Sequence, residues 1–366
     1  MRKISYLEGL RGICCFIVIL DHCINTFKPD LRFTGLSDTG GVVRQLIAWT
    51  PLNIIYSGIA PVCIFFILSG FVLSIKYNNT KMNDVIYQGV IKRYPRLIFP
   101  ILIAMLLMYL AYEILESFTT FSNSLSFSKA ITEAIYTAPF YHVNLTNYAL
   151  WTISFEIYGS LLVFSLLAIF GEKRERLFFY ILTFCFLYLT NSFYSLFVLG
   201  IILSDIYVNR NYRIIPSIRV VIFLIGLILS TSPYPRNGVE VYGGLYSYLR
   251  LFNAQDYNQL YQMLMLTGSS LIFISILGSR FFEKLFNLRL FQYLGKISFP
   301  LYITHVTVLS CGAYYVQSNF PKVTIIDFIL ISAVMITICF MLSSLFEKYI
   351  DAPAIKFANK MAKKLN

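Results

Sequence analysis

The sequence predicts an all-α fold, a polytopic membrane bundle of about ten transmembrane helices with both termini cytoplasmic. Of its 366 residues 57% are hydrophobic and only 13% are charged, whereas soluble domains carry about 45–50% and about 25%. The apolar runs are about 17–25 residues long, which is the length that crosses a bilayer core as a helix. The strands of a membrane barrel would be about half as long and would alternate in polarity. A soluble enzyme, a disordered chain and a fibrous chain are therefore excluded.

The predicted spans follow one another along the whole chain. They lie at 10–27, 53–76, 97–116, 149–170, 176–190, 193–208, 214–232, 257–278, 297–317 and 324–349. The first run contains Asp21 and His22 and lacks a cleavage site of small residues. We therefore expect it to be a retained span and not a signal peptide.

The segments between the spans are too short to fold alone. The longest are the outer stretches 28–52, 117–148 and 233–256. The second contains an amphipathic part, which we expect to pack back onto the bundle as a short interfacial helix or to re-enter the membrane. The third is rich in Pro and Gly and predicts a turn-rich cap. The chain is thus expected to form one membrane domain over 1–350, followed by a basic cytoplasmic tail over 351–366.

The basic residues indicate how the spans are oriented. With a cytoplasmic N-terminus the inner segments hold about 21 of the 30 Lys and Arg, and the outer loops hold about seven. This is the bias of the positive-inside rule, so the net charge of +12 follows from topology and requires no nucleic-acid partner. The seven cysteines all fall inside predicted spans, at spacings that fit neither a disulfide framework nor a zinc site. No metal site is expected.

Ionisable side chains in the first span are candidates for function, because such groups are costly in hydrocarbon. Arg11 and His22 are eleven positions apart, which corresponds to about 16 Å and about three turns of helix. They therefore share one face, with a phosphate-binding cation at the cytoplasmic edge and a proton acceptor deep in the bilayer. The alternative is a topological arginine and a histidine that is only hydrogen-bonded within the core.

Three further spans carry polar candidates. Glu156 lies in the fourth span near the depth of His22. A carboxylate at this depth would fix the tautomer of the imidazole and raise its basicity. The alternative is a structural Glu that is hydrogen-bonded to Ser or Tyr. Arg93 and Arg96 are three residues apart at the start of the third span and suit bidentate phosphate contacts, although a stop-transfer cluster has the same composition. His305 lies in the middle of the ninth span. It is either a catalyst or a support that hydrogen-bonds to another polar group.

An ordered set of motifs resembles the acyltransferase 3 family of integral-membrane O-acyltransferases of carbohydrates. The motifs are Leu7-Glu8-Gly9-Leu10-Arg11-Gly12 followed by His22, Phe65-Phe66-Ile67-Leu68-Ser69-Gly70-Phe71, Arg93-x-x-Arg96, Leu150-Trp151-Thr152-Ile153-Ser154-Phe155-Glu156, Leu294 to Ser298 with Leu301-Tyr302-Ile303-x-His305, and Phe346-Glu347-Lys348 with Pro353. Two of the motifs depart from the family pattern. Glu8 replaces the usual Asp, and Ile157-Tyr158-Gly159 replaces the usual Glu-Gln-Phe, which indicates a different subgroup and acceptor.

The resemblance implies transfer of an acyl group, usually acetyl from acetyl-CoA, to a carbohydrate hydroxyl across the bilayer. It implies that His22 is the catalytic histidine, and that Arg11, Arg93 and Arg96 bind the acyl-CoA. Glu156 matches the acidic position of its motif. The family also implies a multi-pass protein of the bacterial inner (cytoplasmic) membrane.

These expectations combine into one mechanism, in which acetyl-CoA is the acyl donor substrate and no metal takes part. The arginines bind the CoA phosphates, and the pantetheine arm threads the bundle toward His22. Assisted by Glu156 or Asp21, His22 removes the proton of the sugar hydroxyl while that hydroxyl attacks the thioester. A two-step route through an acetyl-imidazole on His22 is the alternative. The candidate oxyanion donors are Ser69, Ser154 and Tyr302.

The predicted function is O-acetylation of a carbohydrate, free or lipid-linked, such as a cell-surface polysaccharide of the lipopolysaccharide O-antigen or exopolysaccharide type. A proton-coupled transporter or translocator of a sugar or lipid-linked glycan, with His22 and Glu156 as proton relay, is the main alternative. A non-catalytic scaffold of a polysaccharide assembly complex is the other. The acceptor sugar and the acyl chain are left open by the sequence.

Overall fold

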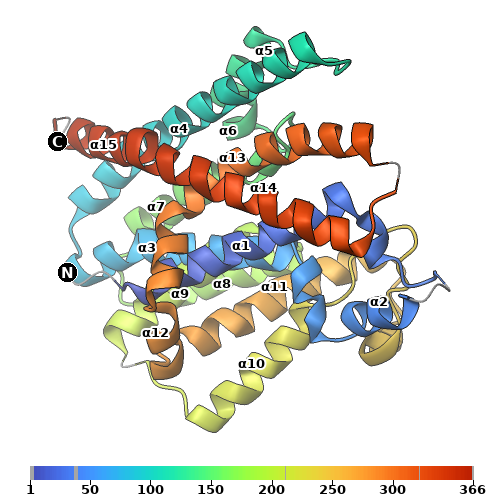
Figure 1. The fold of residues 1–366 in the computed structure, drawn as a ribbon. Helices are drawn as coiled ribbons and strands as arrows, with labels where there is room; N and C mark the ends of the chain where they lie inside the picture. The colour runs from blue at the N-terminus through green and yellow to red at the C-terminus, as the bar shows by residue number, and fades with distance from the viewer. Residues whose placement is uncertain (1–3, 37–39, 211, 321, 365–366) are drawn as a thin grey trace.

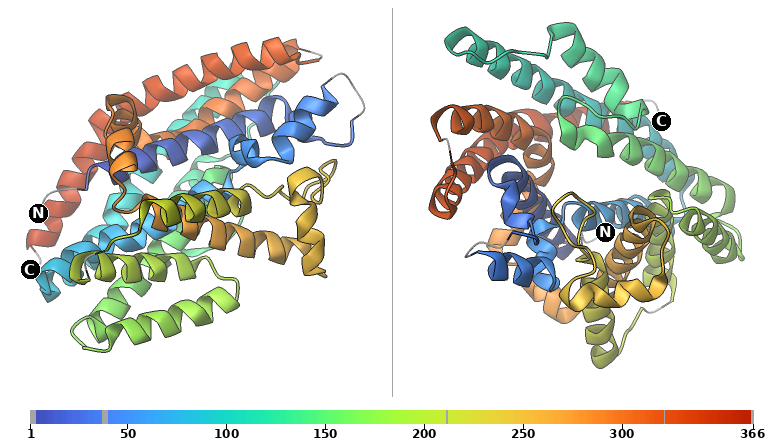
Figure 2. Two further views of the ribbon diagram at one scale, coloured as in Figure 1. Left: turned by 90° about the horizontal axis from the view of Figure 1, so that it is seen from below. Right: turned by 90° about the vertical axis from the view of Figure 1, so that its right-hand side faces the viewer.

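The computed structural model describes residues 4–36, 40–210, 212–320 and 322–364, and every regular element in these ranges is a helix (Figure 1). The N- and C-terminal ends lie on the same side of the molecule, and α2 and η5 lie on the opposite side (Figures 1 and 2). We call these the terminal end and the far end of the bundle.

The long helices coincide with the predicted spans over most of their length. They are α1 (Tyr6–Phe27), α3 (Ile59–Thr80), α4 (Asn83–Phe118), α7 (Trp151–Phe170), α8 (Arg176–Leu189), α9 (Tyr194–Asn209), α10 (Pro216–Ser230), α11 (Tyr257–Ile276), α13 (Arg289–Asn319) and α14 (Ile325–Phe346). The short elements between them are η1 (Pro29–Arg32), α2 (Gly41–Ala48), η2 (Pro51–Tyr56), α5 (Phe127–Thr132), η3 (Glu133–Thr137), α6 (Ala138–Phe140), η4 (Tyr148–Leu150), η5 (Gly244–Phe252), α12 (Arg280–Phe286), η6 (Glu347–Asp351) and α15 (Ala352–Lys364).

Several helices are suited to crossing a membrane. Among the described residues, five are long and apolar enough: α3, α4, α7 with η4, α11, and α14 with its continuation to Lys364. The apolar helices α8, α9 and α10 are shorter. The all-α, multi-pass membrane prediction is thereby confirmed. The number of ten spans and the cytoplasmic position of the termini stay predictions.

Two helices begin well before the predicted spans. α4 begins at Asn83, where we expected the span to begin at 97, and α13 begins at Arg289, where we expected 297. The early part of α4 is polar and contains Pro95, and both features favour a break when only the sequence is considered. The helix nevertheless continues through this segment, so Arg93 and Arg96 lie within α4.

The tail also continues the helical bundle. α14 runs through η6 into α15, which packs along α4 (Figure 1). Ala354, Ala358 and Ala362 form the buried stripe of α15, four residues apart as one helix face requires. Of the predicted tail 351–366, positions 365–366 lie outside the described residues.

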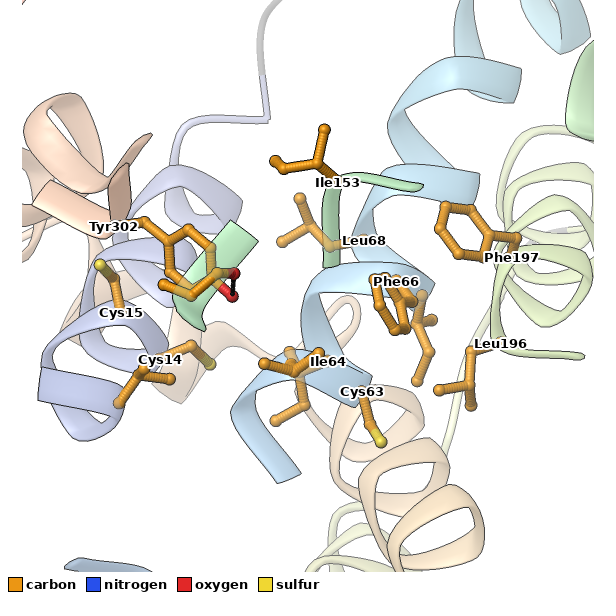
Figure 3. Close-up of a cluster of buried hydrophobic side chains, with 14 of the residues drawn as sticks. Cys14, Cys15, Cys63, Ile64, Phe66, Leu68, Ile153, Leu196, Phe197 and Tyr302 are labelled. Atoms are coloured by element: carbon orange, nitrogen blue, oxygen red, sulfur yellow. Dashed lines mark hydrogen bonds between the residues drawn. The ribbon is translucent and has the colours of Figure 1, made fainter. Parts of the chain in front are cut away.

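The buried core joins α1, α3, α9 and α13. Figure 3 shows Cys14 and Cys15 of α1 beside Tyr302 of α13, while Phe66 of α3 lies beside Phe197 of α9. The rings of Phe66 and Phe197 stack with centroids 5.0 Å apart. The cysteines in this cluster are free thiols that fill space.

A close backbone contact joins α1 and α13, the two helices that carry His22 and His305. A Cβ atom added to Gly12 would overlap the backbone nitrogen of Gly295, and one added to Gly295 would overlap the carbonyl of Glu8. Small residues let membrane helices approach at backbone distance, where dispersion contacts stabilise the pair. The two glycines therefore set the separation of α1 and α13.

Replacing Gly12 by alanine should separate these helices. Overpacking of a close contact costs about 1–3 kcal/mol, so we expect Gly12→Ala to lower the temperature of unfolding in detergent micelles, followed by intrinsic fluorescence. The matched control is Gly35→Ala, because no atom of the described residues lies within 4 Å of a Cβ added there. Unfolding of Gly12→Ala at the same temperature as Gly35→Ala would contradict the close contact.

Candidate functional site

The interior contains two adjoining cavities. The proximal cavity, toward the terminal end, measures about 360 Å³, and the distal cavity, toward the far end, measures about 130 Å³. Val62 of α3 and Tyr302 of α13 line both cavities. These two side chains therefore form a partition, across which the two spaces face each other.

The proximal cavity is lined by charged side chains of both signs. The cations are Arg11, Arg93, Arg96 and Lys296, and the acidic residues are Glu8, Glu156, Glu347 and Asp351. Lys296 pairs with Glu347 at 2.9 Å, and Arg11 lies 3.5 Å from Glu8. The described residues offer Arg96 no carboxylate within 4.0 Å, although Asp351 and Glu8 act on its charge at longer range. Arg96 and Arg11 are thus the cations most available to an anionic ligand.

Arg93 and Glu156 form an ion pair on the inner wall of this cavity. Ser69 of α3 donates a second hydrogen bond to the same carboxylate, at 2.8 Å. The three residues join α4, α7 and α3. The structure therefore places Glu156 against a guanidinium and a serine, which agrees with the alternative of a structural Glu bonded to Ser, and not against His22, which it was one of two candidates to assist. The physical reason is that a permanently charged guanidinium holds a carboxylate more strongly than a neutral imidazole does.

The distal cavity contains His22 near the end of α1. His22 Nδ1 lies 2.7 Å from Nε2 of His305, and Nδ1 of His305 lies 3.0 Å from the carbonyl oxygen of Leu301. A carbonyl only accepts, so His305 carries its proton on Nδ1 and, when neutral, accepts at Nε2. His22 must then donate from Nδ1. Its Nε2 is left as a basic lone pair.

This arrangement fixes the chemistry of His22. His305 is fully buried, and both nitrogens of its ring are bonded, so it orients its partner and does not reach a ligand. Tyr148 contacts the His22 ring edge-on, with centroids 5.0 Å apart. A positioned imidazole with one free nitrogen is a general base or a nucleophile.

Asp21 lies in the distal cavity but is bound elsewhere. Its carboxylate pairs with Arg32 and accepts a hydrogen bond of 3.1 Å from Asn25. The Oδ2 atom is 3.9 Å from Nε2 of His22, beyond hydrogen-bond distance. Asp21 therefore adds a negative charge near His22 without holding its proton.

The three candidate oxyanion donors are already engaged. Ser69 donates within the proximal cavity, as described above. Tyr302 donates to the carbonyl of Ala149 at 2.8 Å. Ser154 Oγ lies 2.5 Å from Nδ1 of His142 and lines neither cavity. Of the three, Tyr302 alone also lines the distal cavity that contains His22.

Two arginines of the distal cavity were not selected from the sequence. Arg32 and Arg236 occur in segments that the sequence predicts to be outer loops, where neither a motif nor a helical periodicity marks a basic residue. Only the fold brings Arg32 to Asp21 and Arg236 to Asn25.

Comparison with known proteins assigns the chain to one family. The model of the acyltransferase 3 family, described as an acyltransferase domain, matches residues 4–344. No curated protein and no solved structure matches the chain. The match includes both cavities except for Glu347, Asp351 and Ile355 of the proximal one.

Proposed function

The chain belongs to the acyltransferase 3 family and is a membrane acyltransferase acting on groups other than amino-acyl groups, and from this premise we propose that it O-acetylates a carbohydrate with acetyl-CoA. The donor binds from the terminal end, which we assign to the cytoplasm. The acceptor, a sugar of a surface polysaccharide or its lipid-linked precursor, binds from the far end. The protein then acts in the cytoplasmic membrane.

The donor side of this proposal rests on the proximal cavity. Arg96 and Arg11 provide positive charge for the phosphates of CoA, and guanidinium groups suit such contacts because they bind phosphate oxygens in pairs. Arg93 contributes through the wall that it forms with Glu156. Beyond these charges the lining becomes apolar with Val62, Phe65 and Phe299, which suits an uncharged pantetheine arm.

The acceptor side rests on His22. The sugar hydroxyl gives its proton to Nε2 of His22 as its oxygen attacks the thioester carbonyl. The tetrahedral adduct then expels the CoA thiolate, and the His22 imidazolium donates its proton to this thiolate. The products are the acetyl ester and free CoA. General base catalysis of this kind contributes about 10²–10⁴ in rate, and His305 contributes by fixing the tautomer.

One observation supports the proposal above all others. Arg11 and His22 lie on one continuous helix, and they line different cavities that share the partition of Val62 and Tyr302. An extended donor held by Arg11 has to cover about 16 Å along α1 and to pass this partition. Its reactive carbonyl then meets the Nε2 side of His22, for which the described residues offer no hydrogen-bond partner.

Substitution of His22 tests the proposed activity. We expect a deletion strain to lose base-labile acetate from its surface polysaccharide, a wild-type gene to restore it, and His22→Ala expressed at the same level not to restore it. The acetate is released by mild base and quantified against the polysaccharide. Equal restoration by His22→Ala would contradict the mechanism, and unchanged acetate in all strains would contradict the acceptor class.

Substitution of Arg96 tests the donor site. Loss of a charged hydrogen bond to phosphate costs about 1.5–3 kcal/mol, so Arg96→Gln should raise the KM for acetyl-CoA about 10–100-fold and change kcat less. Lys92→Gln is the control, since Lys92 lies one turn earlier on α4 and lines neither cavity. An equal rise in KM for both variants would contradict a specific role of Arg96.

A further inference from the structure

The distal cavity has an excess of positive charge that catalysis by His22 does not require. Its charged lining consists of Asp21, Arg32 and Arg236. Two cations thus face a single carboxylate, apart from the imidazole itself. The question is whether the carboxylate neutralises both arginines or only one of them.

Arg32 takes up the carboxylate. Its Nη2 atom binds Oδ1 of Asp21, and its Nη1 donates to the carbonyl of Tyr56 at 2.9 Å. The Arg32 side chain is buried, and its Nε has no hydrogen-bond partner among the described residues. Arg32 and Asp21 therefore form a nearly neutral, buried pair at the base of the cavity.

Arg236 remains without a carboxylate. Its Nη1 donates to Oδ1 of Asn25 at 2.5 Å, and its guanidinium lies over the Tyr234 ring, 5.6 Å from the centroid. The described residues place no carboxylate within 4.0 Å of it. Partial burial lowers the pKa of Arg236, the charge of Arg32 lowers it further, and Asp21 acts in the opposite direction. An anion at this position would relieve the repulsion between the two cations.

The position of Arg236 relative to His22 suits one sugar unit. Asn25, which accepts the hydrogen bond of the Arg236 guanidinium, is three residues after His22 on α1. The side chains of Asn25 and His22 therefore share a helix face, with their Cβ atoms about 5–6 Å apart. A hexose spans a comparable distance between a hydroxyl and its acidic substituent. The rest of the lining includes Trp151, Tyr234 and Tyr261, whose rings provide flat, amphipathic surfaces for a sugar.

We propose that the distal cavity selects an anionic acceptor, a sugar whose carboxylate or phosphate binds Arg236 while its hydroxyl lies at Nε2 of His22. This inference rests on the proposed acyltransferase function and specifies its substrate class. The carboxylate would belong to a uronic or related acid, and the phosphate to a phosphorylated sugar. Both anions offer oxygens that match the free hydrogen-bond donors of the guanidinium.

The test uses the full chain in nanodiscs, where both ends of the bundle are accessible, with radiolabelled acetyl-CoA. Acceptors are offered as matched pairs, namely methyl glucuronide with methyl glucoside and methyl galacturonide with methyl galactoside. Methyl glucoside 6-phosphate provides the phosphate arm. We expect acetyl transfer to an acidic member in preference to its neutral partner, and the better of the two acidic classes identifies the anion.

Variants then assign the preference to one residue. Arg236→Gln should lower kcat/KM for the acidic acceptor about 10-fold or more, with the neutral acceptor changed less than about twofold. Rates with the neutral acceptor show that the variant is folded. Arg250→Gln is the control, because Arg250 is an exposed cation of the same outer stretch, 3.6 Å from Glu240, and lies outside the cavity lining.

The outcomes separate this inference from the proposed function. Transfer that is equal for neutral and acidic acceptors, or that Arg236→Gln lowers equally for both, would overturn the inference and leave the acyltransferase function standing. No transfer to any of these sugars, with acetyl-CoA left intact, would count against the carbohydrate function and would remove the inference with it.

Discussion

The close packing of α1 against α13 is the contact on which the site depends. Gly12 and Gly295 bring the two backbones together, and further along the same pair of helices His22 meets His305. Because His305 is bound on its other side to the Leu301 carbonyl, a main-chain group determines which nitrogen of His22 is basic. A helix contact made of small residues thus controls a proton position deep in the bundle.

The second feature of the site, under the proposed function, is a separate cavity for each of the two substrates. The donor and the acceptor would bind in different cavities, each with its own charges, and would meet only at the partition of Val62 and Tyr302. An ion pair lines each cavity, Arg93 with Glu156 in the proximal one and Arg32 with Asp21 in the distal one. Each pair uses a carboxylate that could otherwise compete for the His22 proton. The His22 ring is therefore hydrogen-bonded to His305 and to neither carboxylate, although Asp21 Oδ2 lies 3.9 Å from its Nε2.

Local features of the site could be predicted from the sequence, and distant ones could not. The positions of the long helices follow from the length of apolar runs, and the common face of Arg11 and His22 follows from helical spacing. The partner of His22 is 283 residues away, and span depth alone favoured Glu156, because depth does not reveal on which side of its helix a residue lies. Arg32, at the end of the short η1, and Arg236, in the segment after α10, reach the distal cavity through local conformations that have no sequence periodicity. The early start of α4 was missed because polar residues and Pro95 precede its apolar part.

The account depends most directly on the tautomer of His22. The chain has three histidines, so ¹⁵N-histidine labelling with His142→Gln leaves only the pair in the nitrogen spectrum. We expect both rings to be neutral near pH 7, each protonated at Nδ1, with coupling across the bond between His22 Nδ1 and His305 Nε2. Protonation of His22 at Nε2, or free exchange of tautomers in the two rings, would contradict the claim that His22 presents a basic Nε2 to the distal cavity.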